Sequence, residues 1–302
     1  MYFVILTIML IVFLLLNIYF SNLVIYPKTH SSQFTYETEL LTGKIIKDEF
    51  EKMPHQEVYI QSPYGYMLYG LFFQVKGSHK TIIICHGFAW SLYGSVKFVP
   101  IFLKRKFNVL IYDHRNHGKS GGKNTTYGLY EKYDLKACID WVVQRFGNDC
   151  VVGTMGESMG AAIALQNTAI DPRVSFCIAD CPFSDLMKLL KLQMKHKSHI
   201  LPQVFIFLSR LLSRWRTGFD YRDVSPARDI ADVKVPILFI HGKDDTFIPK
   251  EMSIDMYKIK QGKKELYLAS NAGHVEAYWN NKEEYEKVID NFLRKINLEE
   301  LA

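Results

Sequence analysis

Short apolar runs alternate with helical patterns along most of this 302-residue chain. Eight runs have the length and composition of strands: residues 58–61, 67–73, 82–85, 109–112, 150–154, 174–179, 237–240 and 266–268. Apolar residues recur at helical spacing in residues 96–106, 127–146, 250–258 and 282–296 and directly after residue 158. Strands that alternate with helices predict an α/β fold with a mostly parallel sheet of about eight strands, covered on both faces. Ligands of such a sheet bind at the carboxyl ends of its strands.

The first 26 residues follow a different pattern. They contain no charged side chain, and residues 2–16 are almost continuously Leu, Ile, Val, Phe and Met. A helix needs about 20 apolar residues to cross a bilayer, so we predict a transmembrane anchor over residues 1–26. A cleaved signal peptide is the alternative, but it needs a basic start and small residues at a cleavage site, and this stretch has neither. A buried helix of the domain would leave one side too apolar.

The remaining chain is predicted as a polar tether, residues 27–56, and one domain, residues 57–302. With 48% hydrophobic residues, a domain of this size can bury a large core, and the composition excludes collagen, disulfide scaffolds and bulk disorder. Lys28, Lys44 and Lys47 follow the apolar stretch, which favours a cytoplasmic domain under the positive-inside rule. The five cysteines show no disulfide framework and no metal-ligand spacing, so we expect reduced thiols and no metal site.

Between the sixth and seventh strands lies an insert, residues 183–222, with a pronounced charge bias. From Leu186 to Phe219 it has no Asp or Glu, and its seven cations are Lys188, Lys191, Lys195, Lys197, Arg210, Arg214 and Arg216. Apolar residues recur at helical spacing on both sides of Pro202, which predicts two short helices. A basic amphipathic helix pair is typical of a membrane-surface element. A solvated cap is the alternative. Nucleic-acid binding is disfavoured because no nucleic-acid fold pattern accompanies the charge.

The pattern with the most specific chemistry is Gly156-Glu157-Ser158-Met159-Gly160. This G-x-S-x-G sequence follows a predicted strand and precedes an Ala-rich helical run, the context in which it places a serine on a sharp turn. Two glycines relieve the crowding where strand and helix nearly touch. A plain turn of small residues is the alternative reading of these five residues alone.

A serine hydroxyl is a weak nucleophile unless a base takes its proton and a carboxylate orients that base. Asp245 lies in the polar loop after the strand 237–240, and His274 follows Gly273 after the last strand. The order Ser158, Asp245, His274 is the order expected after a G-x-S-x-G turn. Asp244 is the alternative acid, and its role is expected to be capping or solvating the loop.

Two backbone NH groups are expected to bind the oxyanion of an acyl-transfer reaction, those of Phe88 and Met159. Met159 follows the serine, and Phe88 lies in the loop after the strand 82–85. His86 is the rival base in that loop. It precedes the serine and adjoins a strand, so we interpret it as a residue that shapes the loop.

With these motifs the chain resembles the α/β-hydrolase family from about residue 57 to about residue 293. The segment from Asp113 to Ser120 matches that family's D-x-R-x-x-G-x-S turn. The match is closest to membrane-anchored serine hydrolases described as peptidase-like or lysophospholipase-like. The resemblance implies a triad of Ser158, Asp245 and His274, no cofactor, and a lid formed by the insert. It also suggests a structural ion pair between Asp113 and Arg115.

The function predicted is hydrolysis of carboxyl esters with an apolar acyl group through an acyl-enzyme. The expected partners are a small ester or lipid substrate and a membrane, contacted by the N-terminal helix and the basic insert. Aminopeptidase-like and thioesterase activities are alternatives that the same triad supports. A membrane-tethered binding module without catalysis is a further alternative, disfavoured because all three triad residues are present.

Overall fold

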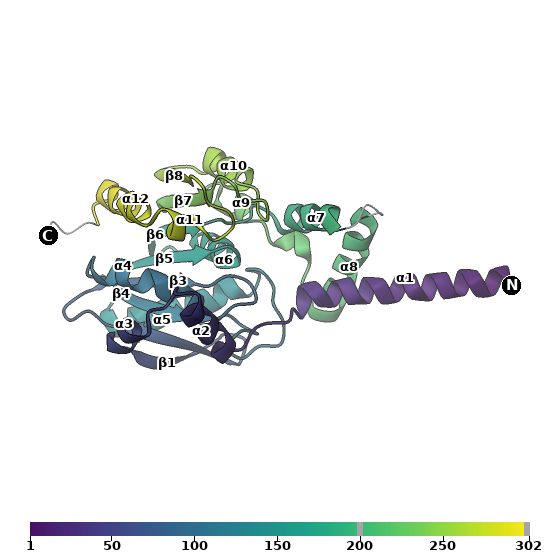
Figure 1. Cartoon of the computed structure of the whole chain (residues 1–302), viewed down its shortest axis with the longest axis horizontal. Helices are drawn as coiled ribbons and strands as arrows, with labels where there is room; N and C mark the ends of the chain where they lie inside the picture. The colour runs from purple at the N-terminus through teal and green to yellow at the C-terminus, as the bar shows by residue number, and fades with distance from the viewer. Residues whose placement is uncertain (198–201, 299–302) are drawn as a thin grey trace.

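A computed structural model of the chain describes residues 1–197 and 202–298 and contains one eight-stranded sheet (Figure 1). The strands are β1 Gln56–Gln61, β2 Met67–Phe73, β3 Lys80–Cys85, β4 Asn108–Tyr112, β5 Val151–Glu157, β6 Val174–Asp180, β7 Ile237–Gly242 and β8 Lys264–Ala269. Their order across the sheet is β1-β2-β4-β3-β5-β6-β7-β8. Strand β2 is antiparallel to both of its neighbours, and every other pair is parallel. The prediction of eight strands in a mostly parallel sheet is confirmed.

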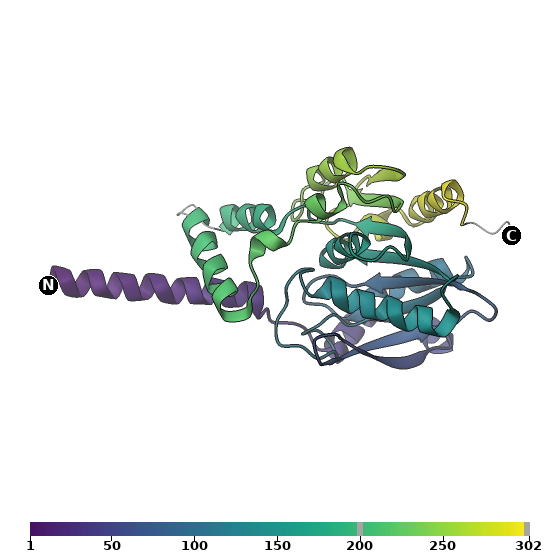
Figure 2. The same cartoon turned by 180° about the vertical axis from the view of Figure 1, so that it is seen from behind.

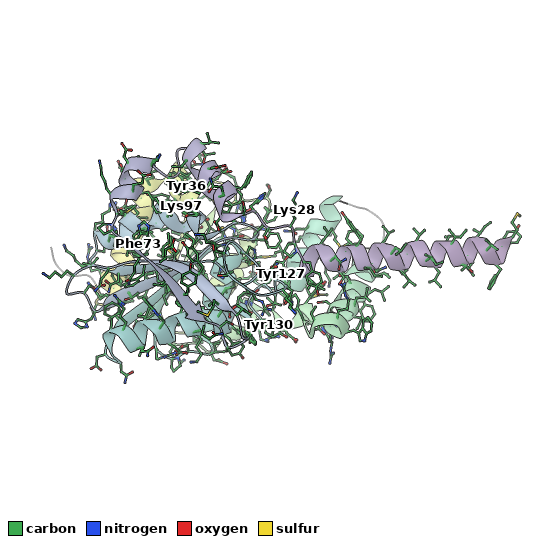
Figure 3. All side chains as sticks on the ribbon, turned by 90° about the horizontal axis from the view of Figure 1, so that it is seen from below. Lys28, Tyr36, Phe73, Lys97, Tyr127 and Tyr130 are labelled. Atoms are coloured by element: carbon green, nitrogen blue, oxygen red, sulfur yellow. The ribbon has the colours of Figure 1, made fainter. Side chains whose placement is uncertain are left out.

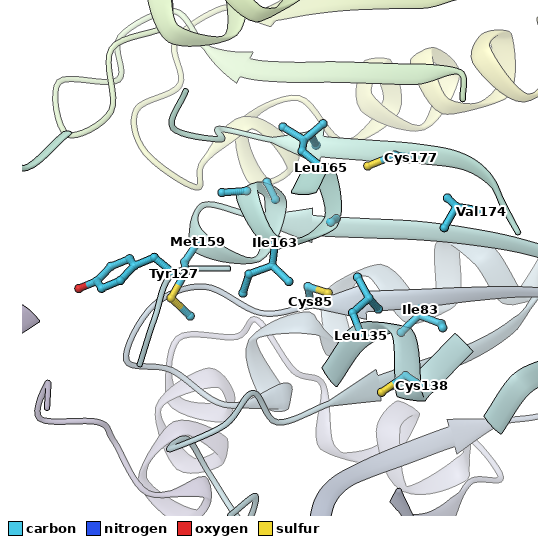
Figure 4. Packing of buried hydrophobic residues seen from close by; sticks show 14 of the residues in the cluster. Ile83, Cys85, Tyr127, Leu135, Cys138, Met159, Ile163, Leu165, Val174 and Cys177 are labelled. Atoms are coloured by element: carbon cyan, nitrogen blue, oxygen red, sulfur yellow. The ribbon is translucent and has the colours of Figure 1, made fainter. Parts of the chain in front are cut away.

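Each face of the sheet carries its own apolar core because successive side chains of a strand point to opposite faces. Along β3, Ile83 and Cys85 pack into one cluster and Ile82 and Ile84 into the other. Figure 4 shows the first cluster, where Ile83 and Cys85 lie beside residues of the helices on that face. A strand buried on both sides must be apolar throughout, which explains the continuous run in the sequence.

Helices cover the two faces in separate sets. One face carries α5 Glu131–Phe146, α6 Met159–Thr168, α9 Pro226–Ile230 and α10 Glu251–Ile259 (Figure 2). The other face carries the 3-10 helix η1 Leu92–Phe98, α4 Val99–Leu103, α11 Ala277–Asn280 and α12 Lys282–Lys295. A second 3-10 helix, η2, spans Tyr221–Asp223. Helices on both faces leave the carboxyl ends of the strands as the open edge.

Helix α1, Tyr2–Ile25, projects from the domain (Figure 1). It is long and apolar enough to cross a membrane, although a signal sequence would meet the same criteria. Most of its side chains are exposed, but Asn17, Ser21 and Ile25 are buried. The carboxyl-terminal part of α1 is therefore packed against the rest of the protein.

The segment predicted as a tether contains two helices, α2 Ser32–Leu41 and α3 Lys47–Lys52. Ser31 caps α2 by accepting a hydrogen bond from the backbone NH of Phe34 at 3.1 Å. Thr35 is buried and hydrogen-bonded to Ser91, and Phe50 belongs to the core. This corrects the expectation of a polar tether. Tyr36 and Phe50 pack against each other and against Tyr93 of the domain, which the polar composition of the segment conceals.

The insert contains α7 Leu186–Lys197 and α8 Pro202–Thr217, which stand beside α1 at the edge of the domain (Figure 1). The side chains of Lys195 and Lys197 lie outside the described part of the chain. Arg210 is buried and paired with Asp220, with Nη1 and Oδ2 2.9 Å apart. Arg216 donates a hydrogen bond of 2.7 Å to Asn22 of α1. Part of the basic charge therefore holds the insert together and fastens it to α1.

Candidate active site

The elbow between β5 and α6 forces Ser158 into a strained backbone conformation, with φ +56°. A Cβ on Gly156 would lie 2.2 Å from backbone atoms of Gly160, and a Cβ on Gly160 would lie 2.1 Å from the carbonyl oxygen of Cys85. Only glycine fits at these two positions. The Ser158 NH donates a 2.8 Å hydrogen bond to the carbonyl of Asp180 on the neighbouring strand β6, which ties the turn to the sheet.

The structure brings the three residues of the predicted triad together. Ser158 Oγ lies 2.9 Å from His274 Nε2, and His274 Nδ1 lies 2.7 Å from Asp245 Oδ2. The three residues come from loops at the carboxyl ends of β5, β7 and β8, where the parallel sheet places them on one edge. Ser158 and Asp245 are buried, while the side chain of His274 is one-fifth exposed.

Asp245 rather than Asp244 is the carboxylate that contacts the histidine. Its Oδ1 accepts hydrogen bonds of 2.9 Å from the NH groups of Phe247 and Ile248, whereas the side chain of Asp244 is exposed. Burial alone would raise the pKa of Asp245. Hydrogen bonds from His241 and His274, and from the Ile248 NH, outweigh burial and hold the pKa well below its usual range.

The ionised carboxylate fixes the tautomer of His274. An ionised Asp245 only accepts hydrogen bonds, so the Nδ1 of His274 carries the proton that it donates. Nε2 then has a lone pair directed at the hydroxyl of Ser158. This arrangement can remove a proton from the serine as it attacks.

The loop after β3 lies beside the serine. A Cβ on Gly87 would lie 3.9 Å from Ser158 Cβ, so the backbone that carries Phe88 reaches the nucleophile, while Met159 begins α6 directly after it. His86 donates from Nδ1 to the Gly87 carbonyl at 2.7 Å and accepts at Nε2 from the His114 NH at 3.0 Å. Both ring nitrogens are occupied by backbone groups, as expected for a residue that shapes the loop.

A second histidine holds the same loop. His117 accepts the Ala89 NH at 3.1 Å through Nε2 and donates to the Arg115 carbonyl at 2.8 Å through Nδ1. Burial lowers the pKa of His86, His114 and His117 and so favours neutral rings, which allows His86 and His117 to accept these NH groups. The sequence analysis identified His86 but not the cluster, because only the fold brings the turn at 113–117 to the loop.

Asp113 and Arg115 have separate partners, which corrects the expected ion pair. Asp113 accepts backbone NH groups from Leu92 and Lys119 at 2.7 and 2.8 Å. Arg115 donates to the carbonyl and side-chain oxygens of Asn124 at 2.9 Å and lies over the rings of Tyr64, Tyr66 and Tyr130. The turn therefore supports the site through hydrogen bonds to the backbone.

Polar residues that the sequence analysis missed line one side of a cavity of about 340 Å³ above Ser158. Lys97 of η1 forms a buried 2.7 Å ion pair with Glu157, the residue before the serine. Glu39 of α2 accepts a 2.8 Å hydrogen bond from Trp90 Nε1, and burial raises its pKa. No local pattern marks Glu39, since it lies in a segment that was read as a tether.

Apolar residues line the other side of Ser158. A smaller cavity contains Tyr127, Leu189, Leu190 and Phe247 and leads toward the insert. Tyr127 lies where the domain meets α1 and the insert (Figure 3). The reacting group of a bound molecule would thus lie between a charged wall and an apolar one.

Among the residues that the structure describes, Cys181 is the cysteine next to the triad. The Sγ of Cys181, a carboxylate oxygen of Asp245 and a ring nitrogen of His274 lie within 4.8 Å of one another. Burial raises the pKa of the Cys181 thiol, and two of the three groups are already engaged with each other. All five cysteines are unpaired.

Comparisons with known proteins find relatives that cover most of the chain. A family model described as "alpha/beta hydrolase fold" matches residues 80–221. Uncharacterized protein YqkD of Bacillus subtilis is 34% identical over 284 residues, which cover 93% of each chain. The esterase Pf2001 of Pyrococcus furiosus has a TM-score of 0.67 and 28% identity, with 84% of this chain and 95% of the esterase covered. Lysophosphatidylserine lipase ABHD12 of Danio rerio is 23% identical over 72% of this chain and 59% of its own length.

Gly160→Ala is expected to lower the free energy of unfolding by about 3 kcal/mol or more, because the new methyl group would meet backbone atoms that cannot move aside. Urea unfolding measures the change. The control is Gly77→Ala, whose new methyl group would meet open space, so it should cost only the roughly 1–2 kcal/mol of a left-handed backbone at φ +78°. Equal losses in the two variants would contradict the role given to the elbow contact.

His114→Phe is expected to gain thermal stability over the wild type as the pH falls. The pKa of His114 is lowered to about 3 by burial and His117, against 6.5 ordinarily, so only the unfolded chain takes up a proton on acidification below 6.5. The wild type therefore loses stability from about pH 6.5 downward, and the variant lacks this loss. Denaturation temperatures at about pH 7.5 and about pH 5 measure the difference. His79→Phe, which removes an exposed imidazole, is the control. A pH-independent difference for His114→Phe would refute the prediction.

Proposed function

This chain belongs to the α/β-hydrolase family, and on that premise we propose that it is a serine hydrolase that cleaves carboxyl esters with an apolar acyl group. Family membership and the esterase neighbours support hydrolase activity. The single observation that carries the finer proposal is the unbroken hydrogen-bond chain from Ser158 through His274 to Asp245.

The proposed reaction uses the same groups in both halves of the cycle. Ser158 Oγ attacks the ester carbonyl while His274 Nε2 takes the hydroxyl proton, and Asp245 stabilises the imidazolium. The NH groups of Phe88 and Met159 bind the oxyanion. The C–O bond to the alcohol then breaks, and His274 returns the proton to the leaving oxygen. Water repeats the sequence on the acyl-enzyme and releases the acid.

The two unlike walls beside Ser158 support an amphiphilic substrate. The side with Tyr127, Leu190 and Phe247 suits the acyl part, and the side with Lys97 and Glu39 suits a polar alcohol part. The names of two similar proteins, an esterase and a lysophosphatidylserine lipase, are consistent with this class. We therefore favour a lipid ester.

We also propose that α1 is an uncleaved anchor. Asn17, Ser21 and Ile25 are buried against the rest of the protein, so loss of the helix would expose the surface that they cover. Lys28, Lys44 and Lys47 favour a domain on the cytoplasmic side. Protease digestion of sealed and opened membranes measures the side, and a mature chain that lacks residues 1–25 would refute the anchor.

An aminopeptidase-like activity is the second candidate, and one observation favours it. Glu39 and Glu157 line the pocket, and a substrate amine requires acidic groups. Lys97 is paired with Glu157, however, which leaves less negative charge for an amine. Cleavage of aminoacyl p-nitroanilides in preference to p-nitrophenyl esters would establish the peptidase.

Ser158→Ala and Asp245→Asn are each expected to lower kcat by about 10⁴-fold or more, because the nucleophile is lost in one and the histidine tautomer in the other. Ester hydrolysis and labelling by a fluorophosphonate probe measure the effects. The matched control is Asp244→Asn, the exposed neighbour, which should retain wild-type activity. A wild type that neither labels nor hydrolyses esters would instead favour a non-catalytic binding module.

A panel of p-nitrophenyl esters is expected to show kcat/KM rising with acyl length, because longer chains bury more apolar area beside Tyr127 and Leu190. Activity should rise further when the long-chain esters are presented in vesicles. A preference for acetate, without any gain on vesicles, would count against the lipid assignment.

A further inference from the structure

A second apolar cavity, of about 400 Å³, lies between α1 and the helical insert. Its far wall is built by Phe20, Leu23 and Val24 of α1 together with Phe205 and Ile206 of α8. Its near end shares Tyr127, Leu190 and Phe247 with the small cavity that contains Ser158. The shared lining residues place the two cavities next to each other, between Ser158 and the apolar helix α1.

Side-chain contacts fix α8 along the carboxyl-terminal half of α1. The ring of Phe205 lies 5.2 Å from that of Phe13 and 5.4 Å from that of Phe20. At the other end of α8, Arg216 donates to Asn22 at 2.7 Å and lies over the ring of Tyr26. Helix α8 therefore crosses the carboxyl-terminal half of α1, as Figure 1 also shows.

These contacts set the depth of α8 in a bilayer. The 24 residues of α1 span about 36 Å, close to the thickness of a hydrocarbon core. Phe13 lies about 18 Å from the end of α1, so Phe205 lies well inside the apolar layer when α1 spans it. Arg216, at the level of Tyr26, lies at the interface.

The surface of α8 fits this depth. Val204, Phe207, Leu211 and Trp215 recur every three or four residues, form one face and are exposed, Trp215 by 83%. Three buried polar residues of α8 find partners inside the protein, whereas Arg214 and Arg216 are exposed on either side of Trp215. Ser209 bonds to Tyr221, Ser213 to the Phe219 carbonyl, and Arg210 to Asp220. An exposed apolar stripe is unfavourable in water and suits lipid.

Given the ester hydrolysis proposed above, we propose that α1 and α8 form an entrance within the bilayer leaflet, through which the acyl chain of a membrane-resident ester reaches Ser158. The anchor is then part of the acyl-binding site. The ester carbonyl moves through the two cavities to the serine without crossing water, and the polar alcohol part follows toward Lys97.

Chain-length selectivity tests the cavity. Val24→Trp fills its far end, so the ratio of kcat/KM for the laurate to the acetate p-nitrophenyl ester should fall at least about tenfold. Tyr19→Trp, on the exposed side of the same helix, should keep the wild-type ratio and activity. If Val24→Trp fails to fold, Leu23→Trp makes the same test, since Leu23 is half exposed. An unchanged ratio in the folded variant would overturn the proposal.

Depth measurement tests the entrance independently of activity. The full-length chain is reconstituted in phosphatidylcholine vesicles whose acyl chains carry bromine, which quenches tryptophan nearby. The tryptophan added by Phe207→Trp should be quenched, and the one added by Tyr59→Trp, on the exposed face of β1, should not. Equal lack of quenching would show that α8 lies outside the lipid and would refute the entrance. Quenching with no ester hydrolysis would refute the proposed function while leaving the depth of α8 established.

Discussion

The contact of two backbones at the elbow is the constraint on which the site depends. Helix α6 starts so close to β3 that Gly160 has no room for a methyl group beside the carbonyl of Cys85. The close packing of Gly160 against β3 holds Ser158 at a positive φ at the carboxyl edge of the sheet. The loop after β3 then passes within contact distance of the serine, and the loops after β7 and β8 reach it from the other side. A sheet with a looser elbow would leave the same residues unable to meet.

The charge of each titratable group at the site depends on its burial and on the hydrogen bonds that it makes. His86 and His117 stay neutral because burial disfavours their charge, and this allows them to accept the NH groups that shape the loop. Asp245 is held ionised by four hydrogen bonds despite burial. Behind the serine, burial and Glu157 raise the pKa of Asp180, whose carboxylate accepts from Tyr285. Asp180 and Asp245 are both buried, yet the pKa of the first is raised and that of the second is lowered, because they differ in their hydrogen bonds and neighbouring charges.

Much of this arrangement could be predicted from the sequence because it depends on local pattern. Apolar runs mark the strands, the two glycines mark the elbow, and chain order alone relates Ser158, Asp245 and His274. The segment 27–56 could not be read correctly, since its packing depends on a few aromatic residues and a cap at Ser31. The partners of Asp113 and Arg115 and the position of Glu39 depend on which loops the fold brings together. Only coordinates reveal that α1 lines a cavity, since its lining residues are as apolar as their neighbours.

The contacts of Arg216 with Asn22 and Tyr26 affect how the enzyme meets its substrate. An anchor joined by a loose linker lets a domain tumble above the surface, whereas this one is fastened to the insert beside the serine. With α1 across a bilayer, the domain keeps one tilt and one height and explores only the plane of the membrane. The enzyme and its ester substrate would then meet by diffusion within the plane of the membrane. The rate of turnover would depend on the mole fraction of the ester among the lipids rather than on its concentration in the surrounding solution.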